Sequence, residues 1–175
     1  MPTFTTRPEL AGCYGMVAST HWIASAVGMK MLEEGGNAFD AAVAAGLVLQ
    51  VVEPHLCGPA GDLTAVVLAA AEGRPRVLCG QGTAPAAATI AHYHAEGLRL
   101  IPGDGLLATV IPGAWDAWML LLRDYGRLPL ERVLGPAIWY ADQGHPPLAA
   151  VCDMIAGMAQ FFEAHWSGSH RLWLP

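Results

Sequence analysis

An almost continuously apolar segment, residues 38–51, dominates the hydrophobic pattern and mixes alanines with larger aliphatic side chains. Arranged as a helix, it carries apolar side chains on nearly every face, which is typical of a helix buried between layers of structure. Asn37 precedes it and Asp40 follows three residues later, a spacing that resembles a capping box with aspartate in place of the usual glutamate. The pattern predicts a thin, buried helix that packs closely against a sheet.

An amphipathic helix is predicted just before it, over residues 22–34. Ile23, Val27 and Met31 are spaced by four residues and therefore share one face of a helix. Ser19 or Thr20 can cap its start, and the glycines at 35–36 end it, because glycine adopts the left-handed conformation without steric cost. Residues 15–20 are predicted to form a short strand that leads into this helix.

Two short apolar segments, residues 63–71 and 76–81, predict an antiparallel hairpin, because a polar turn with glycine and proline separates them. Further helices are predicted over residues 84–96, 114–125, 136–143 and 151–166. Helices combined with a small antiparallel sheet place the chain in the mixed α/β (α+β) class, in which helices pack on a sheet in layers.

Composition narrows the function classes. The 175 residues suit one domain; 54% of them are hydrophobic and 14% charged, against about 25% charged in an average domain, which excludes intrinsic disorder. The net charge of -6 speaks against nucleic-acid binding. The longest apolar run, residues 41–52, is shorter than the roughly 20 residues that cross a bilayer, and the polar N-terminus lacks the apolar core of a secretion signal. We therefore expect a cytoplasmic protein without a membrane partner.

The loop at residues 54–62 concentrates chemically reactive residue types. Cys57 and His55 lie two residues apart, whereas catalytic pairs usually come from distant segments, so we expect a tight turn whose glycines let a neighbour or ligand approach the backbone. A small hydrolase that uses Cys57 is kept as an alternative. His92 and His94 would not share a helix face, so no metal site is expected there. The four cysteines form no CxxC pair, which disfavours zinc and disulfides and predicts small buried residues.

Six short blocks of sequence occur between residues 15 and 147 in a fixed order. They are MVASTH at 16–21, EEGGNAFDAAVAA at 33–45, VVEPH at 51–55 with the glycine-rich loop 58–62 behind it, TAPAAAT at 83–89, IPG at 111–113, and PAI at 136–138 with Ala141 and Gly144. In order and spacing they resemble the N-terminal part of the large subunit of gamma-glutamyltranspeptidases.

That resemblance implies an N-terminal-nucleophile hydrolase fold, a four-layer α-β-β-α sandwich. Residues 15–175 would be an incomplete N-terminal segment of it, after an extension over residues 1–14. In the family, a proenzyme cuts itself, and the new N-terminal threonine of the small subunit attacks a γ-glutamyl amide with its own α-amine as base. The resemblance implies no metal or organic cofactor. The implied partners are the remainder of the large subunit, the small subunit and a small-molecule amide substrate.

The sequence departs from the family at one important position. An Arg-Glu pair usually stands where this chain has Gln81 and Gly82. The family arginine clamps the substrate α-carboxylate through a charged, two-pronged contact, whereas glutamine offers one neutral amide. We therefore expect a divergent member that acts on another amide, with Gln81 lining the acyl pocket and a possible pocket loop formed by His55, Gly58, Gly61 and Asp62.

The chain resembles only the first part of the family proenzyme, and no catalytic residue is assigned to it. We expect the chain alone to be inert and to self-associate or bind a partner, because a missing remainder would leave a sheet edge and an apolar face uncovered. The alternative is a truncated, non-catalytic relic that acts as an interaction protein.

Overall fold

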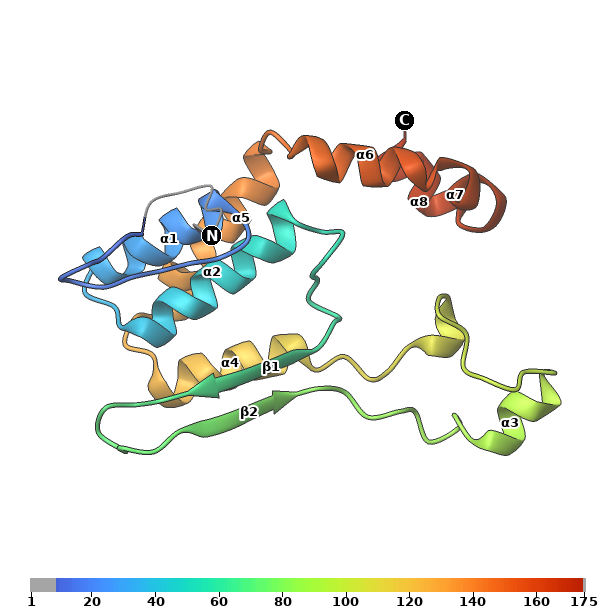
Figure 1. Ribbon diagram of the computed structural model, residues 1–175, viewed down its shortest axis with the longest axis horizontal. Coiled ribbons are helices and arrows are strands. Elements are labelled where there is room, and N and C mark those ends of the chain that lie inside the picture. Colours follow the sequence, from blue (N-terminus) through green and yellow to red (C-terminus); the bar gives the residue numbers. More distant parts are fainter. Residues whose placement is uncertain (1–8, 175) are drawn as a thin grey trace, which may run out of the picture.

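The computed structural model describes residues 9–174 and is mixed α/β, with one small sheet among helices (Figure 1). In chain order the elements are α1 (Trp22–Glu33), α2 (Ala38–Val52), β1 (Leu63–Val67), β2 (Arg76–Gly80), α3 (Ile90–Ala95), the 3-10 turn η1 (Leu106–Ala108), α4 (Ala114–Tyr125), α5 (Leu130–Gln143), α6 (Ala149–Gly157), α7 (Ala159–His165) and α8 (Ser167–Trp173). The expected α/β class is thereby confirmed. None of the helices in this described part is long and apolar enough to cross a bilayer.

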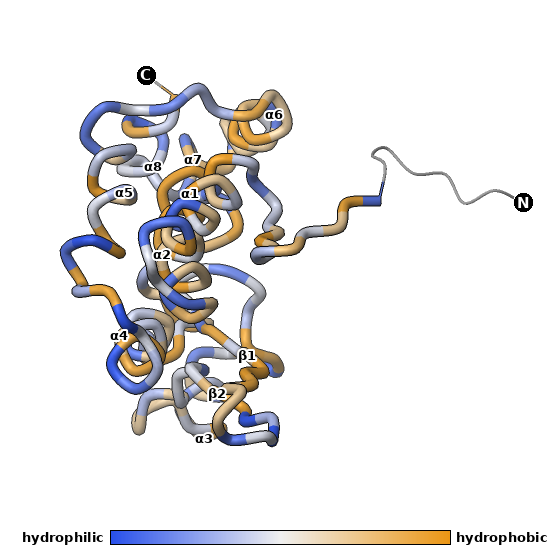
Figure 2. The backbone as a smooth tube through the Cα atoms, turned by 90° about the vertical axis from the view of Figure 1, so that its left-hand side faces the viewer, coloured by the Kyte–Doolittle hydropathy of each residue, from blue (hydrophilic) through white to orange (hydrophobic). Residues whose placement is uncertain are grey.

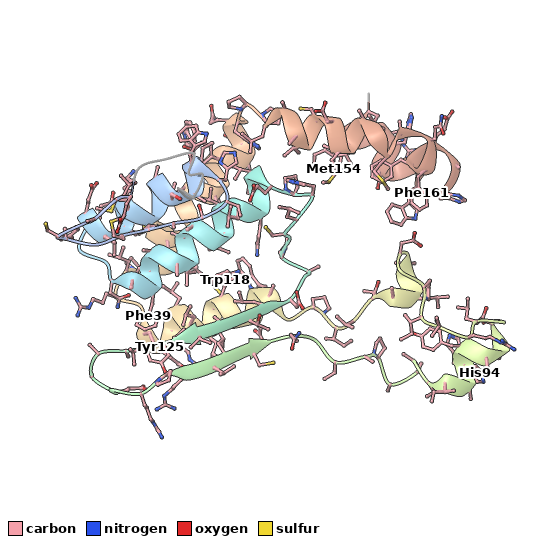
Figure 3. All side chains as sticks on the ribbon, viewed as in Figure 1. Phe39, His94, Trp118, Tyr125, Met154 and Phe161 are labelled. Atoms are coloured by element: carbon pink, nitrogen blue, oxygen red, sulfur yellow. The ribbon has the colours of Figure 1, made fainter. Side chains whose placement is uncertain are left out.

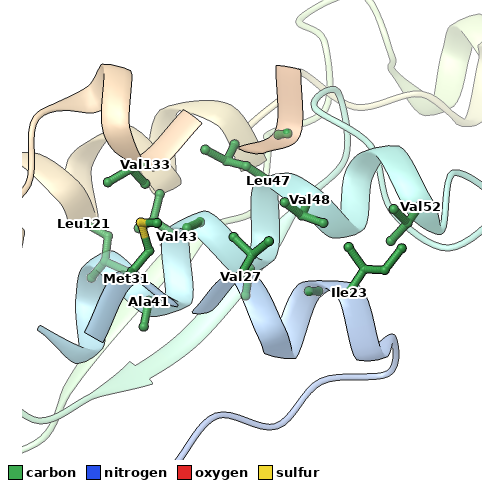
Figure 4. Packing of buried hydrophobic residues seen from close by; sticks show 14 residues of the cluster. Ile23, Val27, Met31, Ala41, Val43, Leu47, Val48, Val52, Leu121 and Val133 are labelled. Carbon is green, nitrogen blue, oxygen red and sulfur yellow. The ribbon is translucent and has the colours of Figure 1, made fainter. Parts of the chain in front are cut away.

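Helix α2 forms the centre of the core and packs against α1, α5 and α4. The predicted stripe of Ile23, Val27 and Met31 on α1 is buried against it (Figure 4). Small residues allow this close contact: a Cβ added to Gly28 of α1 would lie 3.1 Å from the carbonyl oxygen of Ala41, and one added to Gly46 would lie 2.3 Å from the Trp118 ring. The side view shows hydrophobic residues concentrated along α2 (Figure 2).

The prediction that α2 packs against a sheet is confirmed only in part, because its main neighbours among the described elements are the helices α1, α5 and α4. The hairpin packs mainly on α4, and only Val67 and Leu78 from its strands reach the α2 core. An apolar pattern on all faces predicts that a helix is buried but does not say which elements surround it, and a thin alanine surface fits close helix neighbours as well as a sheet.

The start of α2 is held by the predicted capping box. The Asn37 side chain accepts hydrogen bonds from the backbone N–H of Phe39 and Asp40, and the Asp40 carboxylate accepts one from the backbone N–H of Asn37 at 2.7 Å. The same carboxylate also accepts from the N–H groups of Arg127 and Leu128 at 2.9 and 3.1 Å. One buried carboxylate thus joins the start of α2 to the connection between α4 and α5.

An aromatic contact reinforces this junction. The rings of Phe39 and Tyr125 stack with centroids 4.7 Å apart (Figure 3), and Asn37 Nδ2 donates to the Tyr125 carbonyl at 2.6 Å. The N-terminal end of α2 is therefore fixed to the C-terminal end of α4 by both apolar and polar contacts.

The predicted hairpin is confirmed as antiparallel, with Leu63 opposite Gly80 and Val66 opposite Val77. Its strands are shorter than expected, since residues 68–71 already belong to the turn region. Residues alternate across the sheet, so Val67 and Leu78 face the core while Val66 and Val77 face outward and are 75% and 77% exposed.

Other boundaries differ from the predictions. Residues 15–20 form no strand, and the helix expected over 84–96 is reduced to α3, because Pro85 and the turns around it precede a start capped by the Thr89 hydroxyl. Helix α5 begins at Leu130, so Pro136 lies inside the helix that it was expected to open. The helix predicted over residues 151–166 divides into α6 and α7, and α8 follows as a helix that was not predicted. Helix α4 has the predicted bounds. Of the predicted N-terminal extension, residues 1–8 lie outside the described residues.

Candidate functional site

Three segments that are far apart in the sequence meet at the open end of the hairpin. Because β1 begins opposite the end of β2, Asp62 and Gln81 leave the sheet at the same end. The carbonyl oxygen of Gly61 accepts hydrogen bonds from the N–H groups of Gly113 and Ala114, at 3.2 and 3.0 Å. These bonds attach the glycine-rich loop to the N-terminus of α4, and we call this meeting point of Gly61, Gly80, Gly82 and Gly113 the glycine junction.

Glycines make this close backbone contact possible. A Cβ added to Gly82 would lie 1.5 Å from the carbonyl oxygen of Ile111, and one added to Gly113 would lie 2.3 Å from that of Gly80. A Cβ on Gly80 would lie 2.4 Å from that of Ala117. No side chain fits at these distances, so the residues around Gln81 are positioned by backbone packed on backbone.

A groove of about 440 Å³ lies between the end of β2 and α4, and Gln81 lines it. The other walls include Ile111 and Pro112, which precede α4, and Asp116 and Arg123 on α4 itself. The groove therefore presents a neutral amide, a carboxylate and a guanidinium. Asp116 and Arg123 were missed by the sequence analysis; their spacing of seven residues would have placed them on one helix face, but nothing in the sequence indicated which face meets Gln81.

A second groove of about 470 Å³ lies between the C-terminal end of α2 and the loop, with Trp118 of α4 as one wall. His55, Gly58, Gly61 and Asp62 all line it, so the structure brings together the residues of the predicted pocket loop. The two grooves share no lining residue. Gln81 and the loop therefore belong to neighbouring grooves, with the glycine junction between them.

The environment of Cys57 does not favour a nucleophile. Burial, and next the nearby Glu53 carboxylate, raise the pKa of the Cys57 thiol above its ordinary value, which keeps it protonated at neutral pH. His55 Nδ1 is buried and has no hydrogen-bond partner among the described residues. The Glu53 carboxylate is itself buried and accepts a hydrogen bond from the Thr20 hydroxyl. These contacts argue against the alternative of a Cys57 hydrolase.

His92 and His94 are both exposed on α3. Across residues 9–174, no three histidine, cysteine or acidic side chains gather in a way that could hold a metal ion. The prediction that the cysteines are buried is wrong: Cys57 is half-buried, while Cys13, Cys79 and Cys152 are exposed. Cys79 lies opposite Thr64 on the outer face of the hairpin, which no described element covers.

The family model for gamma-glutamyltranspeptidase matches residues 24–175. The chain belongs to the gamma-glutamyltranspeptidase family. It is 40% identical over 145 residues to the glutathione hydrolase-like YwrD proenzyme of Bacillus subtilis, a match that covers 82% of this chain and 27% of that protein. It is also 40% identical over 148 residues to the acylase ACY 1 proenzyme of a Pseudomonas strain, covering 79% of this chain and 26% of the acylase. The chain therefore spans about a quarter of the length of these relatives.

Solved structures similar to this chain contain the same arrangement of elements. The structure of LmbA2991HD has a TM-score of 0.92 and 56% identity, and the match covers 99% of this chain and 30% of that one. The gamma-glutamyltranspeptidase of Helicobacter pylori has a TM-score of 0.83 and 32% identity, covering 91% of this chain and 46% of that one. The expected family and α/β class are thus confirmed, and this chain carries one part of a larger family fold.

Proposed function

We propose that this chain is the N-terminal part of a larger gamma-glutamyltransferase-like enzyme that hydrolyses or transfers the acyl group of a small-molecule amide. The names of its relatives, a glutathione hydrolase-like protein and an acylase, both describe cleavage of such amides, and both relatives are proenzymes. These names support an enzyme that processes itself into two subunits.

In this proposal the nucleophile is a threonine outside the 175 residues, at the N-terminus of the small subunit. Its own α-amine takes the hydroxyl proton while the oxygen attacks the amide carbonyl, and the proton passes to the leaving amine as the amide C–N bond breaks, which leaves an acyl ester on the threonine. Water or an amine then receives the acyl group. The present chain contributes a wall of the acyl pocket and no catalytic residue, and the chemistry calls for no metal or organic cofactor.

The position of Gln81 is the observation that carries the proposal. The glycine junction holds this residue at the end of β2, where it lines a groove with Asp116 and its Oε1 accepts a hydrogen bond from Cys79 Sγ at 3.8 Å. A hydrogen bond to a charged group contributes roughly 1.5–3 kcal/mol and a neutral one about 1 kcal/mol. Replacement of the family arginine by Gln81 therefore weakens recognition of a substrate carboxylate, and we propose an acyl group other than γ-glutamyl. On this proposal, the loop with His55, Gly58, Gly61 and Asp62 supports the pocket from the neighbouring groove.

A Gln81→Arg substitution in the full-length protein tests this function. Hydrolysis of a γ-glutamyl anilide should increase about tenfold for each 1.4 kcal/mol of regained carboxylate binding, while hydrolysis of a neutral N-acyl anilide should not increase. Gln143→Arg is the matched control, because Gln143 is exposed at the end of α5 and lines neither groove. A folded Gln81→Arg enzyme with unchanged γ-glutamyl hydrolysis would show that Gln81 is not part of the acyl pocket.

The second candidate function is a non-catalytic interaction protein, which the exposed apolar outer face of the hairpin favours. The reading frame beyond Pro175 separates the two. A continuation that encodes a threonine-containing cleavage site supports the enzyme, and a stop codon directly after Pro175 supports the interaction protein.

A further inference from the structure

We propose that residues 82–112, which we call the arm, are the docking segment onto which the remainder of the polypeptide packs, and that this packing shapes the groove beside Gln81. The inference rests on the proposed function, because the occupant of the arm is the part of the enzyme outside this chain. It adds the place of contact and its consequence for the pocket.

The arm has almost no support from the rest of the chain. It projects away from the helical body and carries α3 and η1 (Figure 1). Every one of its residues is exposed or half-buried, and neither α3 nor η1 packs extensively on another helix or strand. Its internal ties include a hydrogen bond from the Tyr93 hydroxyl to the Leu107 carbonyl at 2.8 Å and one from the Ile111 N–H to the Thr83 carbonyl at 3.0 Å.

The surface of the arm is apolar. Ile90, Leu100 and Leu106 are 76%, 83% and 92% exposed. The arm contains three charged residues, Glu96, Arg99 and Asp104. Full burial of one large aliphatic side chain contributes about 1.5–3 kcal/mol of stability. A segment as long as the arm that has no core of its own gains too little of this free energy to offset the entropy lost when its backbone is ordered. The arm is therefore suited to an apolar partner that covers it.

The family comparisons favour the remainder of the polypeptide as that partner. The family match runs through the arm, so the arm belongs to the common fold. The LmbA2991HD match covers 99% of this chain at a TM-score of 0.92, yet only 30% of the other chain. An arm of the same path is thus present in a protein more than three times as long, where most of the polypeptide is available to cover it.

Both ends of the arm lie at the candidate pocket. It starts directly after Gln81 and ends at Ile111 and Pro112, and all three residues line the 440 Å³ groove. A partner that fixes the arm therefore fixes two walls of this groove. The proposal makes assembly of the remainder a condition for a formed acyl pocket.

Limited trypsin digestion tests the docking directly. Arg99 is the arm's single trypsin site and is exposed. We expect rapid cleavage after Arg99 in the isolated 175-residue chain and at least tenfold slower cleavage in the full-length protein, with the fragments assigned by mass spectrometry. In the full-length protein, Ile90→Asp combined with Leu106→Asp should restore fast cleavage, whereas Leu10→Asp, at a side chain 69% exposed and outside the arm, should not.

Equal cleavage rates in the isolated chain and the full-length protein would overturn the proposal. Protection of the isolated chain that rises with its concentration would also overturn it, because a second copy of the chain would then cover the arm. The same double substitution in the isolated chain should leave its helical circular dichroism unchanged, since both side chains are exposed there. The digestion requires no turnover. Protection without amide hydrolysis would therefore reject the proposed function and keep the docking, and hydrolysis without protection would do the reverse.

Discussion

At the scale of single residues, glycines rather than reactive side chains define the candidate site. The sequence singled out Gly58 and Gly61 in the loop because glycines permit close backbone approach. In the structure a Cβ on Gly58 would meet nothing within 4 Å, whereas Gly80, Gly82 and Gly113 sit in direct backbone contact. A glycine in a sequence shows that close contact is possible, but only the partner segment decides which glycine requires it.

The glycine junction predicts a large effect at Gly82. Gly82→Ala places a Cβ 1.5 Å from the Ile111 carbonyl, so the backbone must move, and we expect the free energy of unfolding to fall by about 1–3 kcal/mol. Gly58→Ala is the matched control, with open space around its Cβ and an expected change within about 0.5 kcal/mol. Urea unfolding of the 175-residue chain measures both. Equal stability of the two variants would contradict the packing at the junction.

Cys57 provides a second prediction at this scale. Because burial and Glu53 raise the pKa of its thiol, the thiolate is scarce at neutral pH. Alkylation by iodoacetamide should therefore be slow at pH 7 and should rise steeply with pH, with a midpoint above that of an ordinary thiol. Peptide mass spectrometry separates Cys57 from Cys152, which is exposed on α6 and serves as an internal reference. Faster reaction of Cys57 than Cys152 at pH 7 would instead support a nucleophilic cysteine.

At the scale of elements, the helices are held together by a polar contact as well as by apolar packing. Sequence spacing predicted that Asn37 and Asp40 cap α2, and both capping bonds are present. The contacts of Asp40 with the N–H groups of Arg127 and Leu128, some 87 residues away, could not be predicted, because a local motif contains no information about distant segments. The same limit explains why the neighbours of α2 were assigned to a sheet.

The double role of Asp40 predicts a loss of stability larger than that of an ordinary cap. Asp40→Ala removes a buried acceptor from three backbone N–H groups, and we expect the free energy of unfolding to fall by about 2–4 kcal/mol, against about 1 kcal/mol for a typical cap. Asp153→Ala, at an exposed position on α6, should change it little. Chemical denaturation checks both variants, and a loss of 1 kcal/mol or less for Asp40→Ala would show that the distant bonds contribute nothing.

At the scale of the whole molecule, the described chain has a helical core at one end and uncovered apolar surfaces elsewhere. Val66 and Val77 on the outer hairpin face are 75% and 77% exposed. The arm extends beyond the hairpin, so that His94 on the arm lies far from Trp118 on α4 (Figure 3). Contiguous apolar surface of this kind marks an interface. The two sites of exposure are consistent with a chain that spans about a quarter of the length of its relatives.

The isolated chain should therefore self-associate as its concentration rises, which light scattering measures. Val66→Lys combined with Val77→Glu should shift it toward the monomer without loss of the fold, because the two positions face each other across the strands and opposite charges are tolerated there. Ile138→Lys on α5 is the control for added polarity elsewhere, at a side chain 58% exposed. A monodisperse monomer of the unaltered chain would argue that no partner is missing from this face.

The sequence alone determined the family, the α/β class, the burial of α2 and the antiparallel hairpin, because each depends on local periodicity, capping or an ordered series of short blocks. Tertiary structure alone decided which elements surround α2, which glycines are in contact, and that Gln81 and Asp116 line one groove while the 54–62 loop lines another. These features depend on contacts between segments that are distant along the chain. The periodicity of a segment indicates how much of its surface is buried, but it does not indicate which other segment covers that surface.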